Sequence, residues 1–343
     1  MGIERNIAID YAKGVGILLV VYGHVTQGLL NARLQADRGL HELISSVIYS
    51  FHMPLFFFLS GIFFLGSLAR YGGKKLIENK LGTVFYPYLV WSLIQGLIEV
   101  ALSGYTNNAA TLGQVLSLLW LPRAQFWFLY TLFIIYLGSV ALYRRDGTYW
   151  SATILLLAVL LFVLRPLSIG IYPAIAFGKY FVYFALGVSA SNLLLPRGNA
   201  NQPLLPLMFL LATAMFAGSQ YLLLEMSGHE VSNLVQTIRL LLACLGIAFI
   251  ITLCRLLARF ELRWLEFLGR HSMEIYLVHT LGSASIRIVL NKFFGITDFG
   301  LHVALGMLFG VGVPLLLVSL AQKYNFGWLF APPRKLFARA KTP

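Results

Sequence analysis

Long apolar runs restrict the fold of this chain more than any other feature of its sequence. Ten candidate runs follow one another, and most reach the roughly 20 residues that a helix needs to cross a bilayer. Lipid offers no partners to backbone N–H and C=O groups, so such runs fold as helices whose hydrogen bonds close within the segment. We therefore expect an all-α, polytopic transmembrane bundle of about ten helices. The expected spans are residues 7–30, 43–67, 83–103, 126–143, 150–165, 172–194, 204–224, 231–255, 271–290 and 301–322.

Composition and charge agree with a membrane protein and exclude a soluble domain. Of the 343 residues, 11% are charged, against about 25% in soluble domains. The net charge of +13 would suit nucleic acid, but its distribution follows the membrane. With a cytoplasmic N-terminus, 17 Lys and Arg residues fall inside and 5 outside, as the positive-inside rule requires. We expect both termini in the cytoplasm, contacts with anionic lipid headgroups and no nucleic-acid partner.

The chain shows no sign of a second domain or of several common kinds of site. We expect residues 1–343 to form a single integral membrane domain with a basic cytoplasmic tail at about 323–343. The first run, residues 7–30, is too long for a signal peptide and is interpreted as a retained helix. Cys244 and Cys254 lie in or beside one apolar run, which argues against a disulfide framework. The scattered histidines predict no metal site, and the nucleotide-binding P-loop, zincin and serine-hydrolase motifs are missing from the sequence.

Ionisable residues inside the first span are candidates for function. Such residues are costly in a membrane and usually serve a purpose. At about 100° per residue, Asp10, Lys13 and His24 share one face of the helix. Asp10 and Lys13 lie near the cytoplasmic end, where capping or snorkelling explains them equally well. His24 is deeper, so we favour a functional role for it over a packing role.

Three later spans carry further polar candidates, each with a structural alternative. Pro54 should kink or break the second span. His52 and Ser60 would then line a cavity, or Ser60 and Gly61 would simply allow close helix packing. In the fourth span, Trp127 and Tyr130 suit an interfacial aromatic belt, whereas Arg123 could meet an anionic or sugar acceptor. The ninth span places Ser272, Tyr276, His279 and Ser283 on one polar strip, where His279 is either a second catalytic group or a structural hydrogen-bonding residue.

Five motifs together resemble the acyltransferase 3 family of integral membrane acyltransferases. Within that family, the chain is most similar to the fucose 4-O-acetylase group and to enzymes that acetylate exopolysaccharides such as xanthan. The motifs are IDYAKGVGILLVVYGH (9–24), FHMPLFFFLSG (51–61), KLGTVFYPYLVW (80–91), FWFLYTLF (126–133) and LGRHSMEIYLVH (268–279). They occur in the family's order and extend from the first span to the ninth.

The resemblance implies an O-acetyltransferase of the bacterial inner membrane. Its co-substrate would be acetyl-CoA from the cytosol, no cofactor would be bound, and the acceptor would be a hydroxyl of an exopolysaccharide or of a lipid-linked sugar precursor. The family's essential histidine corresponds to His24. Where family members often carry an Arg-rich signature, this chain has RYGGKKLIENK at 70–80.

Acyl transfer to a hydroxyl suggests a role for each candidate. We expect His24 to act as the general base, since a neutral imidazole suits this task. Oxyanion candidates are Ser60, Tyr130 and His279. Lys13, Lys75 and Lys80 are candidates for binding the donor's phosphates, and Arg123 and Trp127 for the acceptor side. Two alternatives of other classes remain, namely a secondary transporter that uses Asp10, Lys13 and His24 as a proton relay and a non-catalytic lipid-binding subunit.

Overall fold

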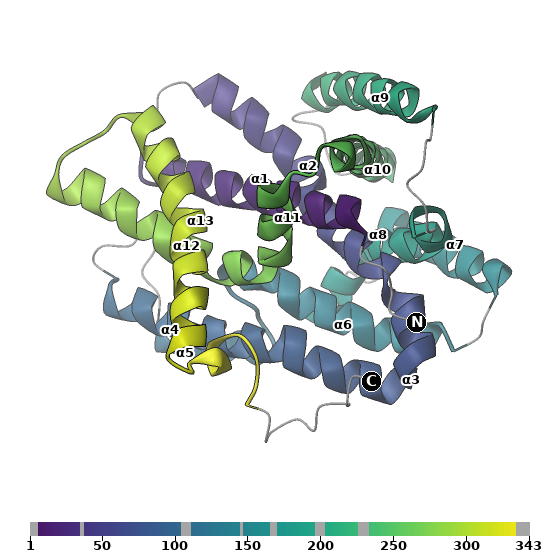
Figure 1. Ribbon diagram of the computed structural model, residues 1–343, viewed down its shortest axis with the longest axis horizontal. Helices are drawn as coiled ribbons and strands as arrows, with labels where there is room; N and C mark the ends of the chain where they lie inside the picture. The colour runs from purple at the N-terminus through teal and green to yellow at the C-terminus, as the bar shows by residue number, and fades with distance from the viewer. Residues whose placement is uncertain are drawn as a thin grey trace. The chain divides into compact units, whose positions relative to one another are not determined.

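The computed structural model describes residues 6–34, 38–103, 111–144, 147–164, 170–195, 203–225 and 233–333, and these residues form helices and turns without strands (Figure 1). Residues 334–343 of the expected basic tail lie outside this description. The α-helices are α1 (Ile7–Asn31), α2 (Arg38–Ile62), α3 (Phe64–Lys80), α4 (Tyr86–Ala101), α5 (Leu112–Leu116), α6 (Trp127–Leu142), α7 (Thr148–Leu164), α8 (Tyr172–Leu194), α9 (Leu205–Glu225), α10 (Asn233–Leu257), α11 (Arg263–Arg270), α12 (Ser272–Ile288) and α13 (Phe299–Lys323). Short π- or 3₁₀-helical segments join several of them, including η1 (Leu81–Phe85) and η3 (Ala124–Phe126).

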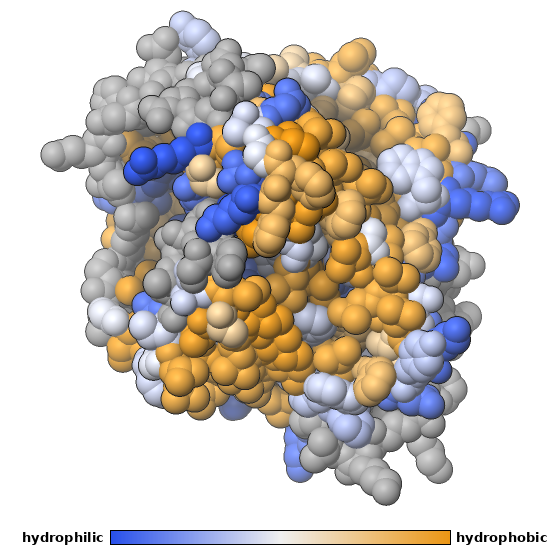
Figure 2. All heavy atoms as spheres, turned by 90° about the vertical axis from the view of Figure 1, so that its left-hand side faces the viewer, coloured by the Kyte–Doolittle hydropathy of each residue, from blue (hydrophilic) through white to orange (hydrophobic). Residues whose placement is uncertain are grey.

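Helices of membrane-spanning length dominate the described residues. Eight segments are long and apolar enough to cross a bilayer, and α7 and α9 are shorter apolar helices. Large apolar side chains stay exposed on such helices, as at Leu156 (60%) on α7 and Leu308 (63%) on α13. Figure 2 shows one face on which hydrophobic side chains form broad continuous areas. Soluble proteins rarely expose such areas, whereas a membrane helix needs them. The predicted all-α, polytopic membrane fold is confirmed.

The chain divides into two compact units, and each is described by itself. Unit 1 comprises residues 1–19, 46–69 and 139–272. Unit 2 comprises residues 20–45, 70–138 and 273–343. Helices α1 and α2 therefore supply residues to both units.

Glycines let the helices of unit 1 pack closely. On α2, a side chain at Gly61 would collide with the backbone carbonyl of Phe184 on α8, and one at Gly187 on α8 would collide with the carbonyl of Phe58 on α2. This is the close contact expected beside Ser60, and small residues commonly permit it between membrane helices. Helix α2 also continues through Pro54, so the expected break at this proline is wrong. A membrane helix tolerates the lost donor because neighbouring groups satisfy the freed carbonyl.

Unit 2 is held together by similar glycine contacts and by its C-terminal segment. On α13, side chains at Gly306 and Gly310 would lie 2.7 Å from Val25 and Val21 of α1. At the other end of α13, the indole Nε1 of Trp91 on α4 donates to the carbonyl of Leu329 at 2.8 Å. These contacts place the second half of α1 beside α13 and fasten the chain after α13 to α4.

Candidate active site

A cavity of about 310 Å³ lies within unit 2. It is lined by the second half of α1, the second half of α4, η3, the end of α12 and the beginning of α13. All the lining residues belong to unit 2, and they are His24, Val25, Gln27, Gly28, Leu29, Asn31, Gln95, Glu99, Ala124, Gln125, Thr280, Ser283, Ala284, Arg287, His302 and Gly306. The cavity volume is at the lower end of the range for small-molecule sites.

One ring nitrogen of His24 is hydrogen-bonded to the backbone, and the other keeps a lone pair for a ligand. Its Nδ1 lies 2.9 Å from the backbone carbonyl of Val20, one helical turn earlier. A carbonyl oxygen only accepts hydrogen bonds, so Nδ1 carries the proton and donates it. In the neutral ring, Nε2 then holds the lone pair. The imidazole is half-buried and lines the cavity, so it can accept a proton from a ligand bound there.

His279 of α12 lies directly beside His24. The two ring centroids are 4.9 Å apart, with the rings at 70° to each other. Nδ1 of His279 lies 2.8 Å from the carbonyl of Tyr276 and 3.1 Å from that of Ile275, so it also donates to backbone. Its Nε2 is buried and has no hydrogen-bond partner among the described residues. The site therefore contains two adjacent imidazoles whose Nε2 atoms both carry lone pairs.

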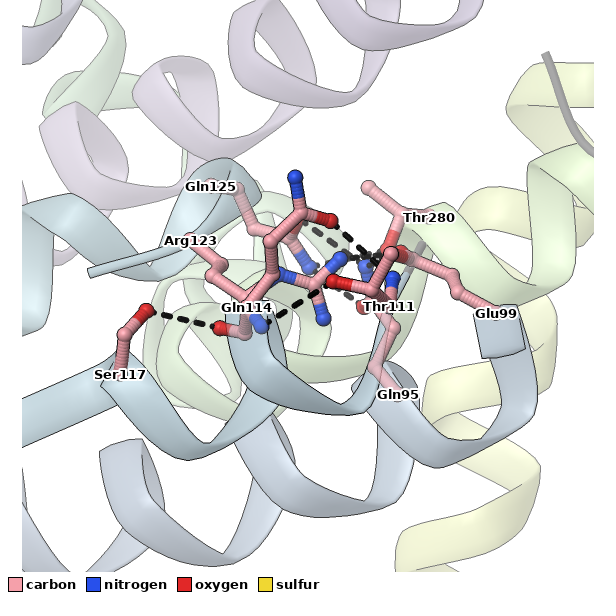
Figure 3. Close-up of polar contacts among 8 residues, drawn as sticks. All are labelled: Gln95, Glu99, Thr111, Gln114, Ser117, Arg123, Gln125 and Thr280. Atoms are coloured by element: carbon pink, nitrogen blue, oxygen red, sulfur yellow. Dashed lines mark hydrogen bonds and ion pairs between the residues drawn. The ribbon is translucent and has the colours of Figure 1, made fainter. Parts of the chain in front are cut away.

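A polar network from three parts of the chain forms one wall of the cavity (Figure 3). Nε2 of Gln125 donates to Oε1 of Gln95 at 2.7 Å and to the hydroxyl of Thr280 at 2.9 Å. The Thr280 hydroxyl donates to the same Gln95 oxygen at 2.8 Å. Gln95 in turn donates to Glu99 at 2.8 Å, and Glu99 pairs with Arg123 at 2.7 Å. The network fastens α4, η3 and α12 around the cavity.

The network leaves hydrogen-bond acceptors for a ligand. Nε2 of Gln95 donates one N–H to Oε1 of Glu99 and the other to Oε1 of Gln125, which lies 3.4 Å away, so Gln95 has no further donor for a ligand. Both N–H groups of Gln125 are used as well. Two groups can still accept hydrogen bonds from a ligand. They are the Glu99 carboxylate, whose two oxygens offer about four lone-pair sites, and Oε1 of Gln125. Acceptors on a cavity wall suit a ligand rich in hydroxyl donors.

The acceptor-side candidates and Tyr130 lie in unit 2 but do not line this cavity. Arg123 forms an ion pair with Glu99, which does line the cavity. Trp127 is the first residue of α6, and its ring lies 6.4 Å from that of Phe128. The hydroxyl of Tyr130 donates to the carbonyl of Leu119 at 2.9 Å.

The expected donor-binding residues are divided between the units. Lys75 is exposed on α3, and Lys80, at the end of α3, places its ammonium 4.5 Å from the ring centroid of Tyr136. Both belong to unit 2. Lys13 belongs to unit 1, where its Nζ lies 3.6 Å from Asp10. Asp10 and Lys13 are two of the three ionisable residues that the helical spacing predicted on one face of α1.

Ser60, the remaining oxyanion candidate, also belongs to unit 1. Its hydroxyl donates to the carbonyl of Phe56 at 2.8 Å, one turn earlier on α2. Hydroxyl groups in membrane helices commonly bond to the preceding turn in this way. The contact gives Ser60 a local role in its own helix.

Sequence reasoning missed most of the polar wall. Gln95, Glu99, Gln125 and Thr280 were not among the expected site residues. One signal was present, because Gln95 and Glu99 are polar residues four apart within an apolar span, and such residues lie on one helical face. Gln125 and Thr280 carried no comparable pattern.

The chain matches a known protein family over most of its length. A family model described as "Acyltransferase domain" matches residues 6–319. Two curated relatives are both named "Nodulation protein NolL". The protein from Sinorhizobium fredii is 27% identical over 187 residues, which cover 54% of this chain and 48% of the relative. The protein from Mesorhizobium japonicum is 34% identical over 100 residues, covering 28% of this chain and 26% of the relative.

The chain thus spans about half the length, or less, of the curated relatives that it matches. No solved structure gives a significant match.

Proposed function

The chain belongs to the acyltransferase family whose domain its residues 6–319 match, and from this premise we propose that it is an O-acetyltransferase of the bacterial inner membrane. Membership makes it an enzyme of acyl transfer, and its apolar helices make it a multi-pass membrane protein. The proposed donor is acetyl-CoA. The proposed acceptor is a hydroxyl of an exopolysaccharide or of its lipid-linked sugar precursor.

The observation that carries the proposal is the position of His24. Its ring lines a cavity, and the carbonyl of Val20 holds its proton on Nδ1. An alcohol is a poor nucleophile at neutral pH, and a base with a free lone pair removes its proton during attack. We assign that role to Nε2 of His24.

The polar wall supports a sugar as the acceptor. Glu99 and Gln125 present hydrogen-bond acceptors to the cavity, and sugar hydroxyls supply the donors. Arg123 fixes the Glu99 carboxylate through their ion pair, so the wall is held in place before the ligand arrives. Preorganised polar groups of this kind select a ligand by orientation.

The direction of the helices suggests how the two substrates enter. The cavity lies toward the end of α1, whereas the N-terminus lies at the beginning of the helix. With both termini in the cytoplasm, the cavity lies on the extracytoplasmic side and takes the acceptor there. Acetyl-CoA would bind at the cytoplasmic side, with Lys75 and Lys80 of unit 2 as contacts for its phosphates.

The test compares the purified wild-type protein with His24→Gln in detergent, supplied with radiolabelled acetyl-CoA and a set of oligosaccharides. We expect transfer by the wild type and a loss of about 10² to 10⁴ in the variant, the usual contribution of a general base. His52→Gln is the matched control, because His52 is buried and its Nδ1 also contacts the carbonyl of the preceding turn, Ile48, at 2.8 Å.

Two results would overturn the proposal. One is unreduced transfer by folded His24→Gln. The other is a wild-type protein that moves a solute across proteoliposome membranes and consumes no acetyl-CoA, which would favour the transporter.

A further inference from the structure

We infer that His279 relays the proton from His24 to the departing sulfur of the acetyl donor. The inference rests on the proposed function and adds a second residue to its chemistry. It starts from an unexplained feature of unit 2, namely that Nε2 of His279 is buried beside His24 and has no hydrogen-bond partner among the described residues. A buried polar atom left without a partner costs free energy, so a site that keeps one usually uses it.

The tautomer of His279 decides which role it can perform. Backbone carbonyls of Ile275 and Tyr276 hold its proton on Nδ1. Nε2 therefore accepts hydrogen bonds in the neutral ring and cannot donate one to an oxyanion. An acceptor beside His24 is useful once His24 has taken a proton, because the imidazolium then has an N–H to share. The ring centroids are 4.9 Å apart and the rings meet at 70°, so the two imidazoles are in direct T-shaped contact.

Position along α12 gives the relay a direction. The residues of α12 that line the cavity, Thr280 to Arg287, follow His279 in the chain. His279 itself does not line the cavity and is fully buried. It therefore lies outside the cavity lining, nearer the beginning of α12 than Thr280. The proposed donor approaches from that side.

The proton and the electron pairs balance over the reaction. The acceptor's O–H bond breaks, its proton passes to Nε2 of His24, and its oxygen forms a bond to the thioester carbonyl carbon. The C–S bond then breaks, and sulfur leaves with the electron pair. The proton passes from Nε2 of His24 to Nε2 of His279 and from there to sulfur, so both rings return to the tautomers that the backbone carbonyls hold.

The experiment measures kcat and both KM values for His279→Gln and His279→Ala with acetyl-CoA and an accepted oligosaccharide. Glutamine fills much of the histidine volume and can form hydrogen bonds but cannot carry a proton. We expect kcat to fall about 10²-fold or more in both variants, with each KM within twofold of the wild type. In His279→Ala, added imidazole should restore part of kcat. His52→Gln, a change at a buried histidine of unit 1, should leave kcat unchanged.

A merely structural role predicts other results. A kcat within threefold of the wild type in His279→Gln would overturn the relay. A lower melting temperature with parallel rises in both KM values would also overturn it. These failures differ from a failure of the proposed function, which would appear as full transfer by His24→Gln or as no transfer by the wild-type protein.

Discussion

Replacing Gly14 by alanine tests how tightly α1 is held in unit 1. A methyl group at Gly14 would lie 2.5 Å from the backbone oxygen of Leu265 and 2.8 Å from the Cδ1 atom of its side chain, both on α11. Ordinary contact begins at 3.4 Å, so the two helices must move about 0.9 Å apart. A gap of about 0.5–1 Å forfeits a quarter to a half of the dispersion energy of each contact, and overpacking costs about 1–3 kcal/mol.

Gly218→Ala on α9 is the control for helix propensity, since a methyl group there meets nothing within 4 Å. Alanine gains up to about 1 kcal/mol over glycine in a helix, and both variants receive this gain. We expect Gly14→Ala to be less stable than the wild type and Gly218→Ala to be equal to it or more stable. The assay is unfolding of the purified proteins in one detergent, followed by fluorescence. Equal stability of the two variants would refute the close contact.

Two further predictions concern the substrates. Glu99→Gln should raise KM for the oligosaccharide about tenfold, with a smaller effect on KM for acetyl-CoA. The change removes the charge that pairs with Arg123 and one set of hydrogen-bond acceptors. Equal changes in both KM values would contradict this assignment. Lys75→Ala should raise KM for acetyl-CoA about fivefold, corresponding to about 1 kcal/mol for an exposed charged contact, and the effect should shrink at high salt; an unchanged KM would remove Lys75 from the donor site.

The fold was largely predictable because a long apolar run in the sequence directly indicates a membrane-spanning helix. Apolar length alone placed all ten spans close to the observed helices, as for 172–194 and α8. The error at Pro54 has a physical cause. Helix α2 continues through Pro54, and membrane helices tolerate proline because neighbouring helices, side chains or water can satisfy the freed carbonyl. The orientation of the termini and the single-domain organisation stay predictions.

The site was less predictable because its members belong to distant segments. His24 stood out as an ionisable residue in an apolar helix, and the structure places it on a cavity. His279 stood out too, but only the structure brings its ring beside that of His24. Gln125 and Thr280 are 155 residues apart, and no periodic pattern links two such positions. Pairing across helices is a property of packing, which a single sequence does not report.

We expect the motifs that carry the family resemblance and the residues of the polar wall to have different roles. Within unit 1, the first and last motifs meet where a side chain at Gly269 would collide with the backbone oxygen of Asp10. Glycines at such positions determine how closely the helices pack, and the protein needs this packing whichever acceptor it uses. Gln95, Glu99 and Gln125 lie outside all five motifs and line the cavity. A relative could keep the motifs and the proposed histidine base while changing these three residues, so we expect the choice of acceptor to vary with the wall and not with the motifs.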